Sequence, residues 1–410
     1  MAFHVGSEVD ALKQVLVHRP GVELRSLGPE NKQRYLFDEL LWVERAQEEH
    51  DLFVDVMEAH DVKVHRLEDL LRETVAIPEA RRAILERSID ARYVGPLAAG
   101  WLNEMFFDME NISLVQHLLG GMTREEAQRL TGCPRSVMLE HVGPGEHIVE
   151  PLPNHLFARD ASTWVGSRVS LNSMHRSIRR RETVHYDAIY RHHPLFAGMV
   201  DVLAPAGGEG PATVEGGDIL VPRDDTVIVG LSERTNAAGV ERLATRLLDA
   251  GEIRRVVVLE LPRTRAFMHL DTVLTMVDEE SFVRYADLPP LRSWTMTASG
   301  QLHGERQLHV TSHKTGDMGH AIASALGVSS VRFLAAAQDH HSAAREQWDD
   351  GCNLLALSPG RVIAYSRNVV TNAYLREQGI EVIEVPGSEL GRGRGGPRCM
   401  SCPVERTPAD

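Results

Sequence analysis

Short apolar segments that are split by a turn recur along the chain. In each segment, apolar and β-branched residues flank a turn rich in Gly, Pro or Asp, which is typical of a β-hairpin. The segments span residues 160–171, 218–229, 271–283 and 353–364. Each opens with a carboxylate or an amide, namely Asp160, Asp218, Asp271 and Asn353. We therefore predict four hairpins, and a fifth unit around the strand 14–18 with its own turn at Pro20 and Gly21.

Helices are predicted between the hairpins. In residues 236–251, apolar side chains recur every three or four positions, and Gly251 stands where a helix commonly ends. Strand–strand–helix units repeated roughly every 50 residues suggest radial repetition around an axis, on which the opening side chains would converge. An irregular α+β domain with unrelated hairpins explains the pattern equally well, so the pattern alone leaves both folds open.

One long segment lacks this alternation. Residues 67–147 contain amphipathic helices, such as 78–87 and 123–130, and no convincing strand. A long helix is predicted just before this segment, over residues 36–60. We therefore predict a helical insertion at 67–147, which divides a main domain into residues 1–66 and residues 148–410.

Composition and charge exclude some partners. The chain of 410 residues has 44 Lys and Arg against 58 Asp and Glu, which gives a net charge of −14. Nucleic-acid binding needs a basic surface, so we expect no nucleic-acid partner. No run of about 20 apolar residues occurs, so we expect no membrane span. Four irregularly spaced cysteines and the lack of a signal peptide at the start favour a reducing, cytoplasmic location.

The C-terminal run 391–403 (GRGRGGPRCMSCP) carries the most chemical information. Its glycines allow the backbone to approach a ligand closely, and its arginines surround Cys399 with positive charge that favours the nucleophilic thiolate. A redox pair of Cys399 and Cys402 would open a helix, which Pro403 disfavours. A zinc site would need two more ligands, but Cys133 and Cys352 stand alone. We predict one working cysteine, Cys399, beside a passive Cys402.

A cysteine nucleophile needs a proton partner and a substrate anchor. His269 and Asp271 stand two positions apart, so on a strand both side chains would face the same side. An imidazole beside a carboxylate can act as a general acid and base. Glu215 and Asp218 bracket two glycines, and Asp160 opens the first hairpin. These acids suit a guanidinium or a divalent metal ion, and their spacing does not decide between the two.

Several motifs then occur in a fixed order. They are 36–38 (LFD), 154–160 (NHLFARD), 179–183 (RRRET), 215–218 (EGGD), 232–235 (SERT), 268–271 (MHLD) and 393–400 (GRGGPRCM). With these motifs the chain closely resembles arginine deiminase, a member of the guanidine-modifying enzyme superfamily. The resemblance covers essentially the whole chain. It implies an α/β fold, a five-bladed α/β-propeller of pseudo-fivefold ββαβ repeats, with a helical insertion where arginine deiminases carry theirs.

The resemblance also implies a reaction, the hydrolysis of free L-arginine to citrulline and ammonia, with no cofactor and no metal ion. Cys399 would attack the guanidinium carbon and form a covalent thiouronium intermediate, while Asp160 and Asp271 hold the nitrogens. His269 would protonate the leaving ammonia and then activate water. Glu215 would orient His269, as the third member of a catalytic triad does.

Substrate-binding roles follow from the same resemblance, in two groups. The α-carboxylate would be bound by Arg179, Arg234 and Asn154. The α-amino end would be lined by Phe157, Gly393, Arg394 and the backbone of Leu36, and Asp218 is placed in the substrate-binding set as well. For the assembly, we expect a homo-oligomer, a dimer or a tetramer.

The chain departs from the family pattern at one position. Related deiminases often place a histidine directly before the nucleophile, whereas this chain has Arg398. A guanidinium keeps its charge where an imidazole would titrate. We therefore expect Arg398 to stabilise the Cys399 thiolate across neutral pH.

Three rival functions stay open. Agmatine deiminases and amidinotransferases belong to the same superfamily, although agmatine has no carboxylate for Arg179 and Arg234 to bind. A metal-dependent hydrolase could use His269, Asp271 and the other acids. A non-catalytic arginine-binding protein would not need the set of Cys, His and Asp.

Overall fold

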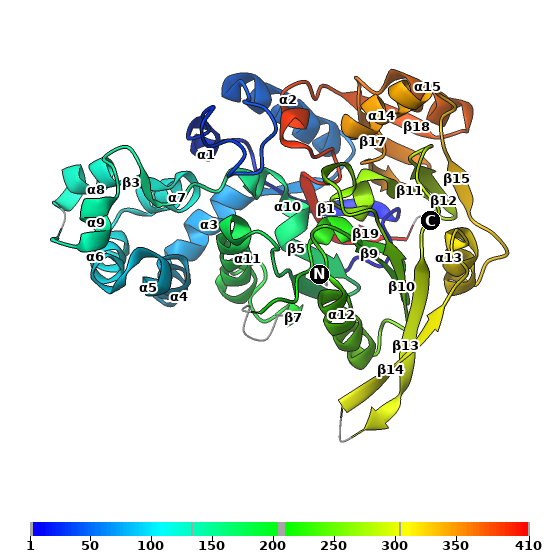
Figure 1. Cartoon of the computed structure of the whole chain (residues 1–410), viewed down its shortest axis with the longest axis horizontal. Helices are drawn as coiled ribbons and strands as arrows, with labels where there is room; N and C mark the ends of the chain where they lie inside the picture. The colour runs from blue at the N-terminus through cyan, green and yellow to red at the C-terminus, as the bar shows by residue number, and fades with distance from the viewer. Residues whose placement is uncertain (1–2, 133, 204–209, 303–304, 409–410) are drawn as a thin grey trace.

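The computed structural model describes residues 3–132, 134–203, 210–302 and 305–408 (Figure 1). Helices and β-sheets alternate along these residues, so the fold is of the mixed α/β kind. Among them, no helix is long and apolar enough to cross a membrane. Cys133, which the sequence leaves as a lone cysteine, lies outside the described residues.

Within the described residues, five sheets share one arrangement, in which the middle strand pairs antiparallel with one neighbour and parallel with the other. In chain order of the hairpins, the sheets contain β5 (Ser162–Val165), β6 (Arg168–Leu171) and β7 (Asp201–Leu203); β8 (Ile219–Arg223), β9 (Thr226–Leu231) and β10 (Arg255–Glu260); β11 (Leu274–Asp278), β12 (Ser281–Arg284) and β15 (Arg332–Leu334); β16 (Leu355–Ser358), β17 (Arg361–Tyr365) and β18 (Glu381–Val385); and β19 (Ser401–Thr407), β1 (Ala11–Val17) and β2 (Lys63–Arg66).

The four predicted hairpins are confirmed as β5–β6, β8–β9, β11–β12 and β16–β17. The fifth unit differs from its prediction. Strand β1 makes no hairpin through Pro20 and Gly21; it pairs instead with β19 from the other end of the chain, with Leu16 opposite Cys402. The short helix α1 (Val22–Arg25) follows that turn. Pairing with β19 lets β1 bury Val15, Leu16 and Val17 completely, which a surface hairpin would not.

A helix connects the two parallel strands of each unit. These helices are α11 (Arg180–His192), α12 (Ala237–Ala250), α13 (Met318–Leu326), α15 (Val369–Glu377) and α2 (Val43–Glu58). The predicted helix around 236–251 is α12, with Asn236 as its N-cap and Gly251 in the left-handed conformation after its last turn. The third unit also carries α14 (His340–Trp348) and a long hairpin of β13 (Ser293–Leu302) and β14 (Glu305–Ser312), which extends the neighbouring sheet beyond the body (Figure 1).

Helices dominate the segment 67–147, which projects to the left in Figure 1. They are α3 (Leu67–Val75), α4 (Pro78–Ser88), α5 (Ala91–Val94), α6 (Pro96–Phe107), α7 (Asn111–Gly120), α8 (Arg124–Thr131) and α9 (Val137–His141). The expectation of no strand is wrong in one detail, because β3 (Met122–Thr123) pairs with β4 (His147–Val149). Leu71 and Leu118 of this segment share one apolar core with Trp164 and Ile189, so it packs tightly on the first unit.

The predicted helix over residues 36–60 begins later than expected, at Val43 of α2. Residues before it form turns, and Leu36 has a φ of +69°, which no right-handed helix contains. This turn lets Tyr35 and Phe37, on either side of Leu36, both reach the buried core. Burial of two aromatic side chains, each of about 1.5–3 kcal/mol, outweighs continuation of the helix.

Candidate active site

The residues that open the first strand of each unit meet at one place. They are Asp160 at the end of α10 (Ala158–Ala161), Asp218 in the 3-10 turn η3 (Gly216–Asp218), Asp271 in the 3-10 turn η5 (Leu270–Thr272), Asn353 before β16, and Cys399 before β19. All of them are buried. The predicted convergence of opening side chains is therefore observed, and Cys399 holds the fifth position.

Hydrogen bonds connect each opening segment to the next, and they return to the first. Gly217 N donates to Asp160 Oδ1 at 3.2 Å, and Leu270 N donates to Asp218 Oδ1 at 2.8 Å. Asn353 Nδ2 donates to the backbone oxygen of Asp271 at 3.1 Å, and Cys399 N donates to Asn353 Oδ1 at 3.0 Å. Arg159 N donates to the backbone oxygen of Cys399 at 3.1 Å and completes the cycle. We call these contacts the hydrogen-bonded ring.

Cys399 lies beside a carboxylate and an amide. Its Sγ is 3.6 Å from Asp271 Oδ2 and 3.1 Å from Asn353 Nδ2. Burial raises the pKa of the Cys399 thiol well above its usual range, and the nearby carboxylates of Asp271, Asp160 and Asp350 raise it further. The expectation that the free protein holds a thiolate across neutral pH is therefore wrong.

The ion pairs of Arg398 explain why its charge does not determine the pKa of the Cys399 thiol. Its guanidinium is fully buried and donates to Asp271 Oδ2 at 2.8 Å and to both carboxylate oxygens of Glu8 at 2.9 and 3.2 Å. These two acids largely neutralise the charge of Arg398. Arg398 therefore lowers the pKa of Cys399 by less than burial and the carboxylates together raise it. The same ion pairs hold the pKa of Glu8 at about 2 in spite of burial, which would raise it.

His269 is paired with acids on both ring nitrogens. Its Nε2 is 2.9 Å from Glu215 Oε2, and its Nδ1 is 3.7 Å from Asp160 Oδ1. Burial alone would lower the pKa of His269, but the carboxylates of Asp160 and Glu215 overcome it and raise that pKa to about 9. The imidazole is therefore a protonated acid at neutral pH, held next to the ring.

His269 and Asp271 do not lie on a strand, so the expectation that both side chains face one side of a strand is wrong. His269 precedes η5, in which Thr272 Oγ1 donates to the backbone oxygen of His269 at 2.6 Å. Asp218 stabilises this turn, because its Oδ1 accepts from Leu270 N and its Oδ2 accepts from Ser232 Oγ at 2.7 Å. Both oxygens of Asp218 thus have protein partners, and the side chain positions the His269 turn.

Glu215 connects His269 to two buried arginines. Its Oε2 is 3.3 Å from Arg234 Nη1 and 3.7 Å from Arg179 Nη1, and its Oε1 accepts from His175 N at 2.9 Å. Burial would raise the pKa of Glu215, but Arg234, His269 and Arg179 hold it far below its usual range. Glu215 is therefore a permanent anion that fixes the orientation of the imidazole.

The side chains expected at the α-carboxylate are engaged by the protein itself. Arg179 donates to Asp160 Oδ2 at 2.7 Å and to Glu182 at 2.8–3.1 Å. Asn154 Nδ2 donates to the backbone oxygen of Tyr35 at 2.8 Å. Arg234 contacts Glu215, and its Nε has no hydrogen-bond partner among the described residues. Arg179 and Arg234 thus lie beside Asp160 and Glu215 in ion pairs, whereas the resemblance implies a role for both arginines at the α-carboxylate.

Residues expected at the α-amino end form a second cluster. The rings of Phe157 and Phe37 stack at 6.2 Å, and a Cβ on Gly393 would lie 2.7 Å from Phe157. The backbone oxygen of Leu36 accepts from Arg265 Nη2 at 2.8 Å. Close packing of this kind explains why residues 393–396 include glycines.

Arg394 has the most unusual surroundings in this cluster. It has a φ of +63°, is buried, and stacks on the Trp348 ring at 3.6 Å. None of its three guanidinium nitrogens has a hydrogen-bond partner among the described residues. Asp350 has a similar deficit, because neither carboxylate oxygen has a described partner and burial raises its pKa to about 7. Unpaired buried groups of this kind are common where a ligand binds.

Sequence reasoning missed Glu8, Asp350 and the contact of Asn353 with the nucleophile. The signal for Asn353 was present, since it opens the fourth hairpin as Asp160, Asp218 and Asp271 open the others. Glu8 gave no comparable signal, because its partner Arg398 stands at the other end of the chain.

A metal ion is a weak alternative at this place. Asp160, Glu215 and His269 offer ligand atoms that all lie within 4.8 Å of one another. However, Arg179 already bonds Asp160 and Arg234 contacts Glu215. The repulsion of two guanidinium groups and a protonated His269 opposes a divalent cation.

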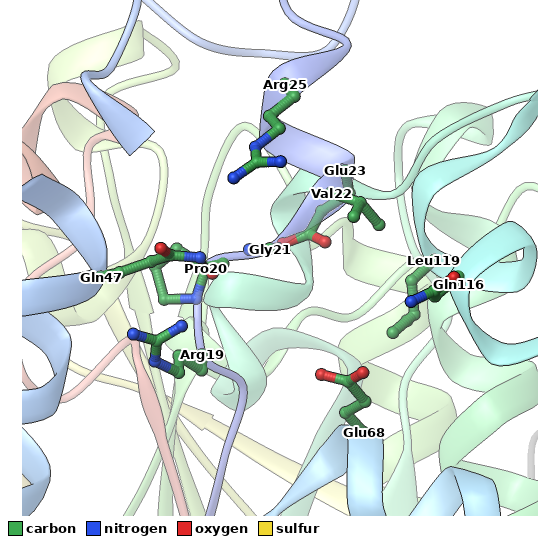
Figure 2. Close-up of a pocket in the computed structure, with 10 residues that line it drawn as sticks. All are labelled: Arg19, Pro20, Gly21, Val22, Glu23, Arg25, Gln47, Glu68, Gln116 and Leu119. Atoms are coloured by element: carbon green, nitrogen blue, oxygen red, sulfur yellow. Dashed lines mark hydrogen bonds between the residues drawn. The ribbon is translucent and has the colours of Figure 1, made fainter. Parts of the chain in front are cut away.

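A separate surface cavity of about 190 Å³ lies beside α1 (Figure 2). Its walls come from α1, the preceding turn, α2, α3 and α7, and consist of Arg19, Pro20, Gly21, Val22, Glu23, Arg25, Gln47, Glu68, Gln116 and Leu119. None of the candidate site residues lines it. The cavity is therefore separate from the hydrogen-bonded ring.

Comparison with solved structures shows where the fold recurs. An amidinotransferase, SxtG from Microseira wollei, aligns over 99% of this chain and 98% of its own with a TM-score of 0.58 and 15% identity. The N-terminal domain of ArgZ, an arginine dihydrolase from cyanobacteria, aligns over 96% and 98% with a TM-score of 0.54 and 12% identity. A dimethylarginine dimethylaminohydrolase aligns over 95% and 99% with a TM-score of 0.52 and 16% identity. These likenesses show a shared fold.

The family itself is shown by sequence. The family model for arginine deiminase matches residues 33–406, which include Leu36, the opening residues of the hydrogen-bonded ring, and His269. A match over nearly the whole chain, together with a buried cysteine, histidine and paired acids, shows an enzyme that acts on guanidino groups. This chain belongs to the arginine deiminase family.

Proposed function

We propose that this protein is an arginine deiminase, which hydrolyses free L-arginine to L-citrulline and ammonia. The observation that carries the proposal is the placement of Cys399 Sγ 3.6 Å from Asp271, in one ring with Asp160 and next to the paired His269 and Glu215. A guanidinium is planar and cationic, and two carboxylates can bind its nitrogens through paired hydrogen bonds. Asp271 Oδ1 is buried with no hydrogen-bond partner among the described residues, so it is free for a substrate N–H.

Binding of the cation also activates the sulfur in this proposal. The carboxylates of Asp271 and Asp160 raise the pKa of the Cys399 thiol in the free protein. A guanidinium between them neutralises that field, so arginine binding favours loss of the thiol proton to solvent. The nucleophile is therefore generated when its target is in place.

In the first stage, the sulfur of Cys399 replaces one nitrogen on the guanidinium carbon. The thiolate attacks the guanidinium carbon, and a C–S bond forms. His269 donates its proton to the departing nitrogen, the C–N bond breaks, and ammonia leaves. The raised pKa of His269, about 9, supplies the acid for this step at neutral pH. The product is a thiouronium linked to Cys399.

The second stage releases citrulline. The neutral His269 left by the first stage accepts a proton from water, and the oxygen attacks the same carbon. The C–S bond then breaks and the thiolate departs, and the attacking oxygen loses its second proton to solvent as the ureido group forms. Glu215 remains ionised throughout, because two arginines hold its pKa far below its usual range, and it stabilises the imidazolium whenever it forms.

The remaining roles are those that the family resemblance implies. Arg179, Arg234 and Asn154 bind the α-carboxylate, and Phe157, Gly393 and the Leu36 backbone line the α-amino end. Arg179 and Arg234 would each exchange an internal carboxylate contact for the substrate. Arg394, which the resemblance also places at the α-amino end, needs no such exchange, because none of its guanidinium nitrogens has a hydrogen-bond partner among the described residues.

The test is a product analysis on a panel of substrates. L-arginine, agmatine, Nω-methylated arginines, and arginine with glycine are incubated with the protein, with and without a chelator. Arginine alone is expected to give citrulline and ammonia in equal amounts, unaffected by the chelator, while agmatine reacts far more slowly. Ornithine formed only with glycine would indicate an amidinotransferase, and loss of activity with chelator would indicate a metal-dependent hydrolase; either result contradicts the proposal.

We also propose that the five sheets form a closed five-bladed α/β-propeller. Support comes from the common strand pattern of the sheets and from the cyclic hydrogen-bonded ring. The insertion boundaries at 67–147, the cytoplasmic location and a homo-oligomeric assembly stay predictions from the sequence.

A further inference from the structure

Asn353 differs from the other residues that open a hairpin. Asp160, Asp218 and Asp271 place a carboxylate at this position, whereas the fourth unit places an amide. The Asn353 side chain is completely buried and bridges the Asp271 and Cys399 segments. The one opening hairpin residue with an amide in place of a carboxylate thus lies beside the sulfur of Cys399.

The contacts of Asn353 fix which amide atom faces the sulfur. Oδ1 accepts from the backbone N–H of Cys399 at 3.0 Å, and a backbone N–H can only donate. Nδ2 donates to the backbone oxygen of Asp271 at 3.1 Å, and a carbonyl can only accept. Nδ2 is therefore the atom 3.1 Å from Cys399 Sγ, and its second hydrogen is available to the sulfur.

The sulfur has little other help from donors. Among the described residues, Asn353 Nδ2 is the N–H group within hydrogen-bond distance of Sγ. The guanidinium of Arg398, the residue before Cys399, bonds Glu8, Asp271 and the backbone oxygen of Ile219. Burial and the carboxylates of Asp271, Asp160 and Asp350 raise the pKa of the thiol.

We propose that Asn353 is a catalytic residue, whose Nδ2–H group hydrogen-bonds to Cys399 Sγ and stabilises the thiolate that attacks the substrate and later leaves. The proposal rests on Cys399 as the nucleophile of the proposed function. A hydrogen bond to an anion is stronger than one to a neutral group, so the contact favours the thiolate over the thiol. A carboxylate at position 353 would repel the thiolate, which explains the amide.

The backbone around Asn353 keeps the donor in place. Asn353 N donates to the backbone oxygen of Asp350 at 2.9 Å, and a Cβ on Gly396 would lie 2.7 Å from the backbone oxygen of Asn353. The glycine thus lets the nucleophile loop approach Asn353 closely. A donor that is held rigidly before the reaction costs no reorganisation when negative charge develops on the sulfur.

The experiment measures the titration of Cys399 without substrate. Asn353→Asp keeps the shape and the acceptor for Cys399 N but replaces the donor by an acid, and Asn353→Ala removes both. Asn368→Ala is the matched control, because Asn368 is equally buried and its Nδ2 donates at 2.9 Å to the backbone oxygen of Asp349 in the same segment, away from the sulfur. Iodoacetamide alkylation of Cys399 is followed from acidic to strongly alkaline pH, with the modified peptide identified by mass spectrometry.

The midpoint of alkylation is expected to rise by about one to two pH units in Asn353→Ala, the size of a hydrogen bond to a charged group, and by more in Asn353→Asp. Asn368→Ala should keep the wild-type midpoint. Wild-type midpoints in both Asn353 variants, or an equal rise in Asn368→Ala, would overturn the proposal. So would failure of both Asn353 variants to fold while Asn368→Ala folds, since Asn353 would then be a structural clamp. Because no substrate is present, the result is independent of whether arginine is the substrate.

Discussion

At the scale of single residues, the surroundings of Cys399 carry negative charge that disfavours its thiolate. Burial and the carboxylates of Asp271, Asp160 and Asp350 all raise the pKa of Cys399. The carboxylates of Asp160 and Glu215 raise the pKa of His269 to about 9 against the effect of burial. The free protein therefore holds a neutral thiol and an imidazolium, and in the proposed function a cationic substrate releases the thiol proton.

The acid role of His269 gives a prediction for pH dependence. Replacement of Glu215 by Gln removes a carboxylate 2.9 Å from Nε2 and should lower the pKa of His269 by about one unit or more. The protonated imidazole is present below its pKa and lost above it, so the alkaline limb of kcat against pH should move to lower pH. Glu252→Gln, which changes a surface glutamate bonded to Ser167, should leave the limb in place. An unmoved limb in Glu215→Gln would mean that another group supplies the proton.

Arg398 gives a prediction for stability. Arg398→Met would leave Glu8 and Asp271 as buried acids without their partner, which typically costs about 3–5 kcal/mol in the free energy of unfolding. Arg361→Met removes an exposed pair with Glu381 and should cost at most about 1 kcal/mol. Urea denaturation of both variants measures the difference. Equal losses would show that the buried cluster contributes no more than a surface pair.

Residue identity was predictable where chemistry restricts the choice. Cys399, His269 and Asp271 stand out because few residue types can act as nucleophile, proton carrier or guanidinium anchor. The ion-pair partners of Arg398 were not predictable, since one of them is Glu8, a residue near the opposite end of the chain. Internal ion pairs of Arg179 with Glu182 and Asp160 likewise depend on tertiary packing.

At the scale of elements, the short turns that open the strands, and not the strands themselves, form the hydrogen-bonded ring. At each turn a side chain or a backbone group bonds to the neighbouring unit, and a continuous strand would use that backbone group in its own sheet. Hairpins were predictable from alternating apolar residues around Gly, Pro or Asp turns. The turn η5 was not, because Asp218 and Thr272 impose it through contacts that alternation does not encode.

Gly217 tests how closely these turns pack. A Cβ at this position would lie 2.6 Å from His269 Nδ1 and 2.7 Å from its Cγ. Gly217→Ala should therefore displace the imidazole and lower kcat by about 100-fold, the effect of a misplacement near 1 Å, while circular dichroism stays unchanged. Gly28→Ala, where a Cβ meets nothing within 4 Å, is the control. Full activity in Gly217→Ala would show that the imidazole tolerates a shift.

At the scale of the whole molecule, the two ends of the chain complete the site together. Strand β1 lies beside β19, which begins two residues after Cys399 (Figure 1). Glu8 precedes β1 and bonds Arg398. The helical segment 67–147 shares its apolar core with the first unit and contributes none of the candidate site residues. Its helical nature was predictable from periodicity, whereas the pairing of β1 with β19 was not, because sequence patterns carry no information on partners so far apart.

The central claim, covalent catalysis by Cys399 on arginine, is tested most directly by mass spectrometry of acid-quenched enzyme during turnover. Cys402 is buried against Ser162 and Tyr190, so Cys402→Ser should keep most activity and leave one cysteine in the tryptic peptide that follows Arg398. We predict that this peptide gains the mass of arginine less ammonia on Cys399, and that Cys399→Ser shows neither adduct nor citrulline. Citrulline production by Cys399→Ser at the wild-type rate would contradict the account.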